Sequence, residues 1–242
     1  MIFFHSVSVE RGKRHFKRVV MRDVNWRIAP RSRVVILGHR LSGVEVMPGL
    51  ISGMAVPTSG WIERRGSFSP AKGFLKYGFD SLYQLVSRLS RLYQVDPKDV
   101  REFVEEGVQR RDLFHVKPQF IPLQLQKQLN VLLVYAFPFD YYLFGNPPSL
   151  GGEGRFEVFC QRAYELRCRQ AGIIVIANST KNVRGLGEGV MGAVLYRGDL
   201  TLYEKFADAA SVFNSLPPEH NKLEIADSVE EEDPDSELDI LL

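Results

Sequence analysis

The residues that follow one apolar strand have the outline of a phosphate-binding loop. The stretch VVILGHRLSGVEVMPGLISG (34–53) runs from β-branched residues into glycines and then into an apolar segment. In the pattern G-x-x-x-x-G-K-[ST], backbone amides wrap the phosphates, the lysine neutralises their charge and the hydroxyl binds Mg²⁺. Gly38 and Gly43 keep the outer spacing, but Val44 replaces the lysine and Glu45 replaces the hydroxyl residue. A carboxylate at this place reverses the charge that a triphosphate requires.

The loop positions could still hold part of a cofactor. The candidate binding residues are Gly38, His39, Arg40, Leu41, Ser42, Gly43, Val44 and Glu45, which together form a degenerate phosphate loop. His39 or Arg40 could supply the missing positive charge. Pro48 raises a backbone objection, because proline beyond the first turn removes a helical hydrogen bond and costs about 3 kcal/mol. We expect the helix after the loop to be short or bent.

Hydrophobic periodicity predicts the elements that must position this loop. Residues 34–38 are wholly apolar, as in a strand buried in a parallel sheet. Residues 1–9 alternate as an edge strand, with 19–28 as the antiparallel partner across a basic tip at 11–18. The later segments predict helices at 81–93, from 96–97 onward, at 123–137, 155–170 and 204–213, strands at 140–144 and 173–178, and a hairpin at 193–203. This alternation favours an α/β fold with a mainly parallel sheet.

Charge divides the chain into a basic body and an acidic end. The net charge of the 242 residues is only +2, yet residues 217–242 contain ten acidic residues and one lysine. The first 216 residues therefore carry a net charge of +11. We expect one domain over 1–216, a helical subdomain inserted at about 79–130, and a disordered acidic tail at 217–242. The two cysteines and the five histidines lack metal-ligand spacing, so no metal site is expected.

With its elements in this order, the chain resembles the nucleotide-binding subunit of an ATP-binding-cassette (ABC) transporter. The likeness is greatest to the branch that exports capsular polysaccharide and O-antigen. It is carried by MIFFHSVSV with the basic hairpin, VILG followed by LISG and PTSGWI, RLYQVD, and FDYYLF followed by RFEVFC. The resemblance implies a P-loop NTPase-like domain of α/β class, with an N-terminal antiparallel element, a mainly parallel core sheet and an inserted helical subdomain.

Carried over position by position, the resemblance also shows which functional groups are missing. Gly145 and Asn146 stand where the family has its Mg²⁺-binding aspartate and catalytic glutamate, and Asn178 stands for the switch histidine. Leu123 and Gln124 take the places of the signature serine and glycine. The stacking aromatic falls near Arg11, the aspartate loop near Ser149–Gly152, and the glutamine loop near Asp80. A carboxamide or glycine cannot act as a general base or bind a metal like a carboxylate.

The leading hypothesis is therefore a non-catalytic, pseudo-ATPase subunit of a polysaccharide export transporter. We expect no catalytic residue, no metal, and no ATP or Mg²⁺ cofactor. The partners implied are a transmembrane permease subunit, an intact ABC ATPase subunit, or a second copy in a dimer. The location implied is cytoplasmic, peripheral on the inner face of the cell membrane.

Two alternatives remain open at this stage. The chain could be an active ATPase that energises capsular polysaccharide or O-antigen export, in which case ATP and Mg²⁺ would bind. It could instead be an interaction or sensing protein that uses the acidic tail and the basic hairpin as contact surfaces. Nucleic-acid binding is not expected, since the tip at 11–18 has only Phe16 among its basic residues.

Overall fold

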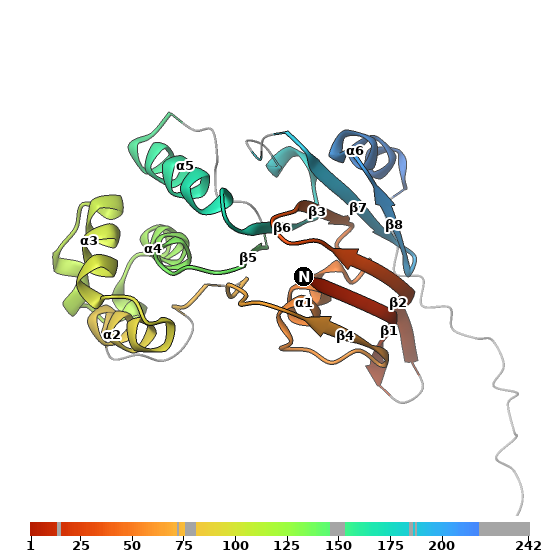
Figure 1. The fold of residues 1–242 in the computed structure, drawn as a ribbon, viewed down its shortest axis with the longest axis horizontal. Helices are drawn as coiled ribbons and strands as arrows, with labels where there is room; N and C mark the ends of the chain where they lie inside the picture. Colours follow the sequence, from red (N-terminus) through yellow and green to blue (C-terminus); the bar gives the residue numbers. More distant parts are fainter. Residues whose placement is uncertain are drawn as a thin grey trace, which may run out of the picture.

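The computed structural model describes residues 1–13, 16–71, 73–75, 81–145, 153–183, 186 and 188–217. Two sheets and a group of helices make up this part of the chain (Figure 1). The predicted positions of Asp80, Asn146, Ser149–Gly152 and nearly all of the acidic tail lie outside the described residues. Within the described part of the chain, no helix has the length and apolar character needed to cross a bilayer.

The N-terminal sheet has three antiparallel strands in the order β2-β1-β4. They are β1 (Ile2–Lys13), β2 (Phe16–Ile28) and β4 (Ser59–Arg64). The prediction that the first residues form an edge strand is wrong, because β1 pairs on both sides. Alternation of apolar and polar residues indicates a strand with one buried face. It does not show whether a later strand, here β4, pairs with the second edge.

A bulge in β1 keeps its apolar side chains on one face. Ile2 and Phe4 are buried at even positions, whereas Val7 and Val9 are buried at odd positions. The register with β2 shifts between Phe4 and Val7, and Ser6 takes a positive φ of 47° there. One extra residue reverses the alternation and bends the strand.

The core sheet has the strand order β5-β6-β3-β7-β8. Its members are β3 (Arg33–Gly38), β5 (Tyr141–Phe144), β6 (Gly172–Ala177), β7 (Val190–Tyr196) and β8 (Asp199–Tyr203). All pairs are parallel except β7 with β8. The predicted buried strand at 34–38 is thus the centre of the sheet, and the predicted mainly parallel α/β fold is confirmed.

Alternate side chains of β3 enter two separate hydrophobic cores. Val35 and Leu37 pack with the helices, whereas Val34 and Ile36 pack with the N-terminal sheet. All four are at most 1% exposed. A strand that is covered on both faces must be apolar at every position, which is why VVIL shows no alternation.

Six α-helices complete the described fold: α1 (Met47–Ser52), α2 (Leu82–Tyr93), α3 (Pro97–Val108), α4 (Leu123–Ala136), α5 (Arg155–Cys168) and α6 (Phe206–Ser215). The start signals of α2 and α3 act as the sequence predicts. Ser81 Oγ accepts from Gln84 N at 3.2 Å, and Asp96 Oδ1 accepts from Lys98 N at 2.7 Å. These bonds satisfy amides that the first turn leaves unpaired. In Figure 1, α2 to α4 lie together beyond β5, away from α6.

Candidate functional site

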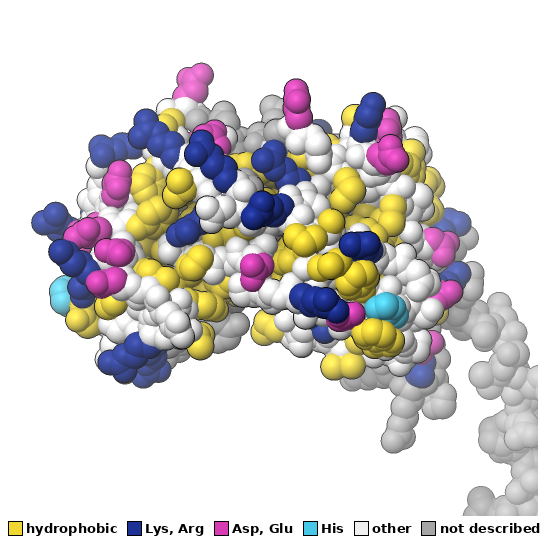
Figure 2. All heavy atoms as spheres, in the orientation of Figure 1, with side chains coloured by type: hydrophobic (Ala, Val, Ile, Leu, Met, Phe, Trp, Pro, Cys, Tyr) yellow, Lys and Arg dark blue, Asp and Glu magenta, His cyan; other side chains and the backbone are white. Residues whose placement is uncertain are grey.

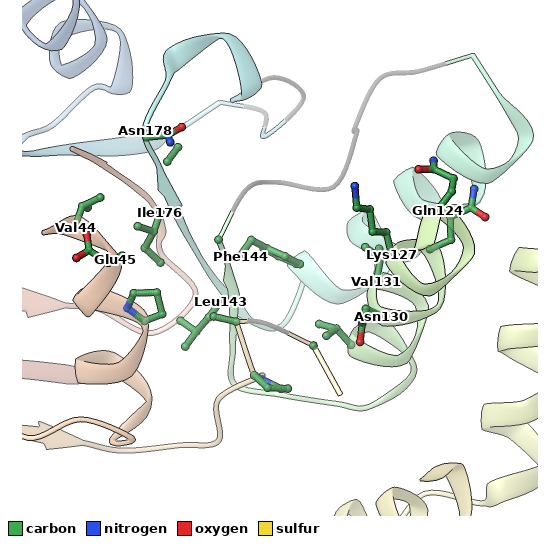
Figure 3. Close-up of a pocket in the computed structure, with 18 of the residues that line it drawn as sticks. Val44, Glu45, Gln124, Lys127, Asn130, Val131, Leu143, Phe144, Ile176 and Asn178 are labelled. Atoms are coloured by element: carbon green, nitrogen blue, oxygen red, sulfur yellow. The ribbon is translucent and has the colours of Figure 1, made fainter. Parts of the chain in front are cut away.

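A cleft of about 720 Å³ opens between the core sheet and α4. One wall comes from the ends of β5 and β6 and from the loop after β3. The other wall is one face of α4, because Gln124, Lys127, Gln128 and Val131 follow helical spacing and all line the cleft. Figure 3 shows the α4 residues across the cleft from Val44 and Glu45. The position beyond the carboxyl ends of parallel strands is a common place for ligands in α/β folds.

The cleft gathers several of the residues that the sequence singles out. Val44, Glu45, Gln124, Gly145 and Asn178 all line it (Figure 3 labels all of these except Gly145). Asn146 lies outside the described residues. Leu123, beside Gln124 at the start of α4, is 67% exposed. The side chains of His39 and Arg40 do not line the cleft within the described part of the chain.

Val44 turns inward and helps to fill the loop. Its side chain is 5% exposed, and Ser42 is 1% exposed beneath the same turn. A Cβ atom at Gly38 would overlap the Ser42 hydroxyl and Val44 Cβ, so the side chains of Ser42 and Val44 close the space against the end of β3. The apolar Val44 side chain, at the position that the sequence resemblance assigns to a lysine, is thus largely buried within the loop.

Three backbone amides of the loop already have partners inside the chain. Ser42 N donates to His39 O at 2.9 Å, and Val46 N donates to Gly43 O at 3.0 Å. Val44 N donates to Ser42 Oγ at 3.2 Å. Amides that are bonded internally are not free to wrap an anion, which is the mechanism by which such loops bind phosphate.

The helix after the loop is short, as predicted, but not for the predicted reason. A 3₁₀ turn (Val44–Val46, η1) leads into α1, which has only six residues. Pro48 occupies the first turn of α1, where proline is tolerated because its missing N–H would be unpaired anyway. The predicted interior kink is therefore wrong, and the chain accommodates Pro48 by restarting the helix before it.

His39 and Arg40, the residues that the sequence suggests as replacements for a lysine, lie away from the cleft lining. The His39 ring stacks on Phe213 of α6, with centroids 4.5 Å apart, while Arg40 is exposed. Arg11 reaches the loop instead, because its guanidinium donates to Glu45 Oε1 at 3.0 Å. This ion pair joins β1 to Glu45 in the loop after β3.

Three charged side chains line the described part of the cleft. Among its described lining residues, Lys127 is the cation and Glu45 and Glu157 are the carboxylates. Asn130 is engaged, since its Oδ1 accepts from Leu75 N at 2.9 Å. The described residues contain no group of three or more His, Cys, Asp or Glu side chains that could hold a metal ion.

Two ionisable groups near the cleft are held in their neutral forms. Burial and the nearby Glu157 raise the pKa of the Cys160 thiol to about 12. Burial and Asp140 raise the pKa of the Tyr141 hydroxyl to about 12. Loss of solvation disfavours the charged form of an acid, so neither group is a nucleophile at neutral pH.

The sequence singles out Gln124 of α4, but not Lys127 and Gln128, which also line the cleft. Lys127 and Gln128 lie three and four residues after Gln124 in the segment predicted as a helix. The spacing alone places them on the same face. The signal that could have found them is the polar start of an otherwise apolar helix.

Comparison with solved structures defines the class of protein. The chain matches two dimeric structures of the bacterial ATP-binding cassette MJ0796, one of them bound to ADP and Pi, with TM-scores of 0.69 and 0.68. Each match has 15% sequence identity and covers 85% of this chain and 99% of the other. The protein therefore has the ABC cassette fold. No protein-family model matches the sequence.

The sequence relatives narrow this class. The chain is 28% identical to the capsule polysaccharide export ATP-binding protein CtrD of Neisseria meningitidis serogroup B, over 90% of this chain and all of that one. It is 26% identical to the ATP-binding protein BexA of Haemophilus influenzae, over 81% of this chain and 90% of the relative. The polysialic acid transport ATP-binding protein KpsT of Escherichia coli is also 26% identical, over 71% of this chain and 76% of the relative. The chain is thus similar to ABC ATP-binding subunits of the capsule polysaccharide export type, as the sequence resemblance predicts.

Proposed function

We propose that this chain is a cassette subunit of a polysaccharide export transporter that does not hydrolyse ATP. The transport role is supported by relatives whose names state capsule polysaccharide export and polysialic acid transport. The loss of hydrolysis is supported by the loop after β3. There, a buried Val44 and internally bonded amides occupy the place of a phosphate cradle.

The groups that would act on the γ-phosphate are also missing. Gly145 offers no metal ligand, and Asn178 has no ring nitrogen that can exchange a proton. Hydrolysis needs a base that activates water and charges that stabilise the leaving phosphate. The Gly145 position supplies no metal-binding charge, and Glu45 adds a negative charge near the loop.

The proposed role is structural or regulatory. In this role the chain pairs with an intact ABC ATPase subunit and docks on a transmembrane permease subunit at the inner face of the membrane. The fold supports this placement, because the two structural neighbours are dimeric cassettes. Both hydrophobic cores are intact, so the subunit keeps the cassette fold.

Calorimetry of ATP binding to the purified chain, with and without Mg²⁺, tests this proposal. We expect no binding tighter than a Kd of about 100 μM, or about −5.5 kcal/mol. We also expect no Mg²⁺-dependent release of phosphate. The Escherichia coli relative named above serves as the positive control under the same conditions. Tight binding together with turnover by this chain alone would overturn the proposal.

An active ATPase remains the second candidate function, because all three relatives are named as ATP-binding proteins. In that case, turnover should appear when a partner subunit completes the site. The assay is therefore repeated with an intact ATPase from the same transporter, whose own catalytic glutamate is replaced. Turnover in this mixture would support the second candidate and exclude the pseudo-ATPase.

A further inference from the structure

The outer face of α5 carries a stripe of arginines interleaved with apolar side chains. In α5, Arg155, Val158 (40%), Arg162 and Leu166 (63%) are exposed, and so is Arg169 directly after the helix. At 3.6 residues per turn, these five positions fall within about a quarter of the helix circumference. Figure 2 shows several basic side chains over the region in which Figure 1 places α5.

The three arginines have no acidic partner among the described residues. Other exposed cations do, since Arg11 pairs with Glu45 and Lys17 pairs with Glu10. The carboxylate exposed beside the stripe is Glu165, and its Oε1 accepts from Gln161 Nε2 at 2.8 Å. With three arginines and one neighbouring carboxylate, the stripe presents a net positive charge next to exposed apolar side chains.

We propose that the acidic C-terminal segment, residues 218–242, binds this arginine stripe of its own chain. The segment includes the run EEEDPD (230–235), with five carboxylates in six residues, and ends in the apolar sequence LDILL. Its composition therefore matches the stripe in both respects, with carboxylates for the arginines and leucines for Val158 and Leu166.

The lengths of the two partners agree. From Arg155 to Arg169 the helix rises about 21 Å at 1.5 Å per residue. Six residues of extended chain span about 20 Å. Arginine binds carboxylates through paired N–H donors, so a run of acidic side chains along the helix can engage each guanidinium in turn.

The segment also starts within reach of the stripe. Asn214 near the end of α6 contacts Thr180, with 3.2 Å between the side-chain oxygens. Tyr164 of α5 donates to Leu186 O at 3.2 Å, a few residues further along the same connection. Twelve residues lie between Pro217 and Glu230, and the thirteen Cα steps that join these two can span about 43 Å, more than the length of α5.

Zero-length carbodiimide cross-linking of the full chain tests this contact. The reagent joins lysine amines to carboxylates, so Arg162→Lys adds a reporter and keeps the charge. We expect mass spectrometry to find cross-links from position 162 to residues 230–235. Arg91→Lys on exposed α2 is the matched control and should give none. The yield at position 162 should fall several-fold in 1 M NaCl, where the Debye length is about 3 Å.

Two outcomes would overturn the proposal. One is cross-linking of the acidic run to other lysines, such as Lys17 or Lys205, with none at position 162. The other is equal binding of anionic phosphatidylglycerol vesicles by the full chain and by a variant whose five carboxylates at 230–235 are amides. That result would show that the stripe is free for lipid. Vesicle binding that appears only in the amide variant would support coverage of the stripe by the segment.

Discussion

The strand β3 and the loop that follows it are neighbours in the chain, but they keep different parts of a nucleotide-binding cassette. In β3, every side chain from Val34 to Leu37 is buried and both edges are paired. In the loop, Gly38 and Gly43 keep the spacing of a phosphate loop, and we propose that Val44 and Glu45 replace the groups that would meet phosphate and metal. Burial constrains β3 through packing, whereas the polar positions are constrained only by chemistry.

The largest effect should come from opening a cavity beneath β3. Replacement of Leu37, which is fully buried, by alanine should lower the free energy of unfolding by about 2–5 kcal/mol. Urea denaturation followed by circular dichroism measures this loss. Leu92→Ala is the control, since Leu92 is 68% exposed and should change stability by about 0.5 kcal/mol or less. If Leu37→Ala and Leu92→Ala lowered the free energy of unfolding equally, burial would not explain why β3 is apolar at every position.

Restoring a lysine in the loop should have a smaller effect and should not restore the chemistry. Val44→Lys places an ammonium beside buried Ser42 and should cost about 1–3 kcal/mol. Val56→Lys at an 86% exposed position is the control and should be nearly neutral. ATP hydrolysis should stay absent in Val44→Lys, because Gly145 still lacks a carboxylate. Phosphate-release assays check this, and turnover in this single variant would contradict it.

Alkaline pH should weaken the core next to the cleft. The pKa of Tyr141 is raised to about 12 in the folded chain, and the ordinary value is about 10. Below pH 10 the hydroxyl is neutral in both the folded and the unfolded chain, and the free energy of unfolding is not reduced. As pH rises from 10 towards 12 the unfolded chain ionises first, so the free energy of unfolding falls by up to about 1.4 kcal/mol per pH unit. Tyr141→Phe should lose less stability than the wild type between pH 9 and pH 11. The same comparison with the partly exposed Tyr83→Phe serves as the control, and an identical slope for all three proteins would refute the expectation.

The smallest effect is expected at the ion pair that joins the hairpin to the loop. Arg11 and Glu45 are both more than half exposed, so Arg11→Ala should change stability by about 0–1 kcal/mol. Unfolding curves at low and high salt measure it, and the difference should shrink as salt rises. Glu45→Gln should behave in the same way. If Arg11→Ala destabilised the chain as much as Leu37→Ala, the ion pair would matter as much to stability as a buried core residue, which would contradict this expectation.

Much of the fold could be predicted from the sequence because periodicity and capping are local. Ser81, Asp96 and Pro97 mark the starts of α2 and α3 where the structure has them. The spacing that begins at Leu82 also includes Leu92, but the structure leaves Leu92 exposed near the end of α2. Helical spacing predicts which side chains share one face of a helix. It does not show how far along that face a neighbouring element packs.

The site was predictable in composition but not in arrangement. The substitutions at Val44, Glu45 and Gly145 can be read from spacing alone. The stacking of His39 on Phe213 and the pairing of Arg11 with Glu45 join residues far apart in the chain. Such contacts depend on how α6 and the hairpin pack, which no local pattern encodes. Pro48 lies in the first turn of α1 because the chain forms a 3₁₀ turn before this helix, and the sequence did not indicate that break.

The place of β3 in its sheet has a consequence for the order in which the chain folds during synthesis. The N-terminal sheet can form early, because all of its strands lie within residues 2–64. The neighbours of β3 are β6 at 172–177 and β7 at 190–196, so its apolar edges stay unpaired until the ribosome has made most of the protein. Long-range parallel pairing is slow, and an exposed apolar strand promotes aggregation. A nascent chain that ends before residue 196 therefore lacks part of the strands that pair with the two edges of β3.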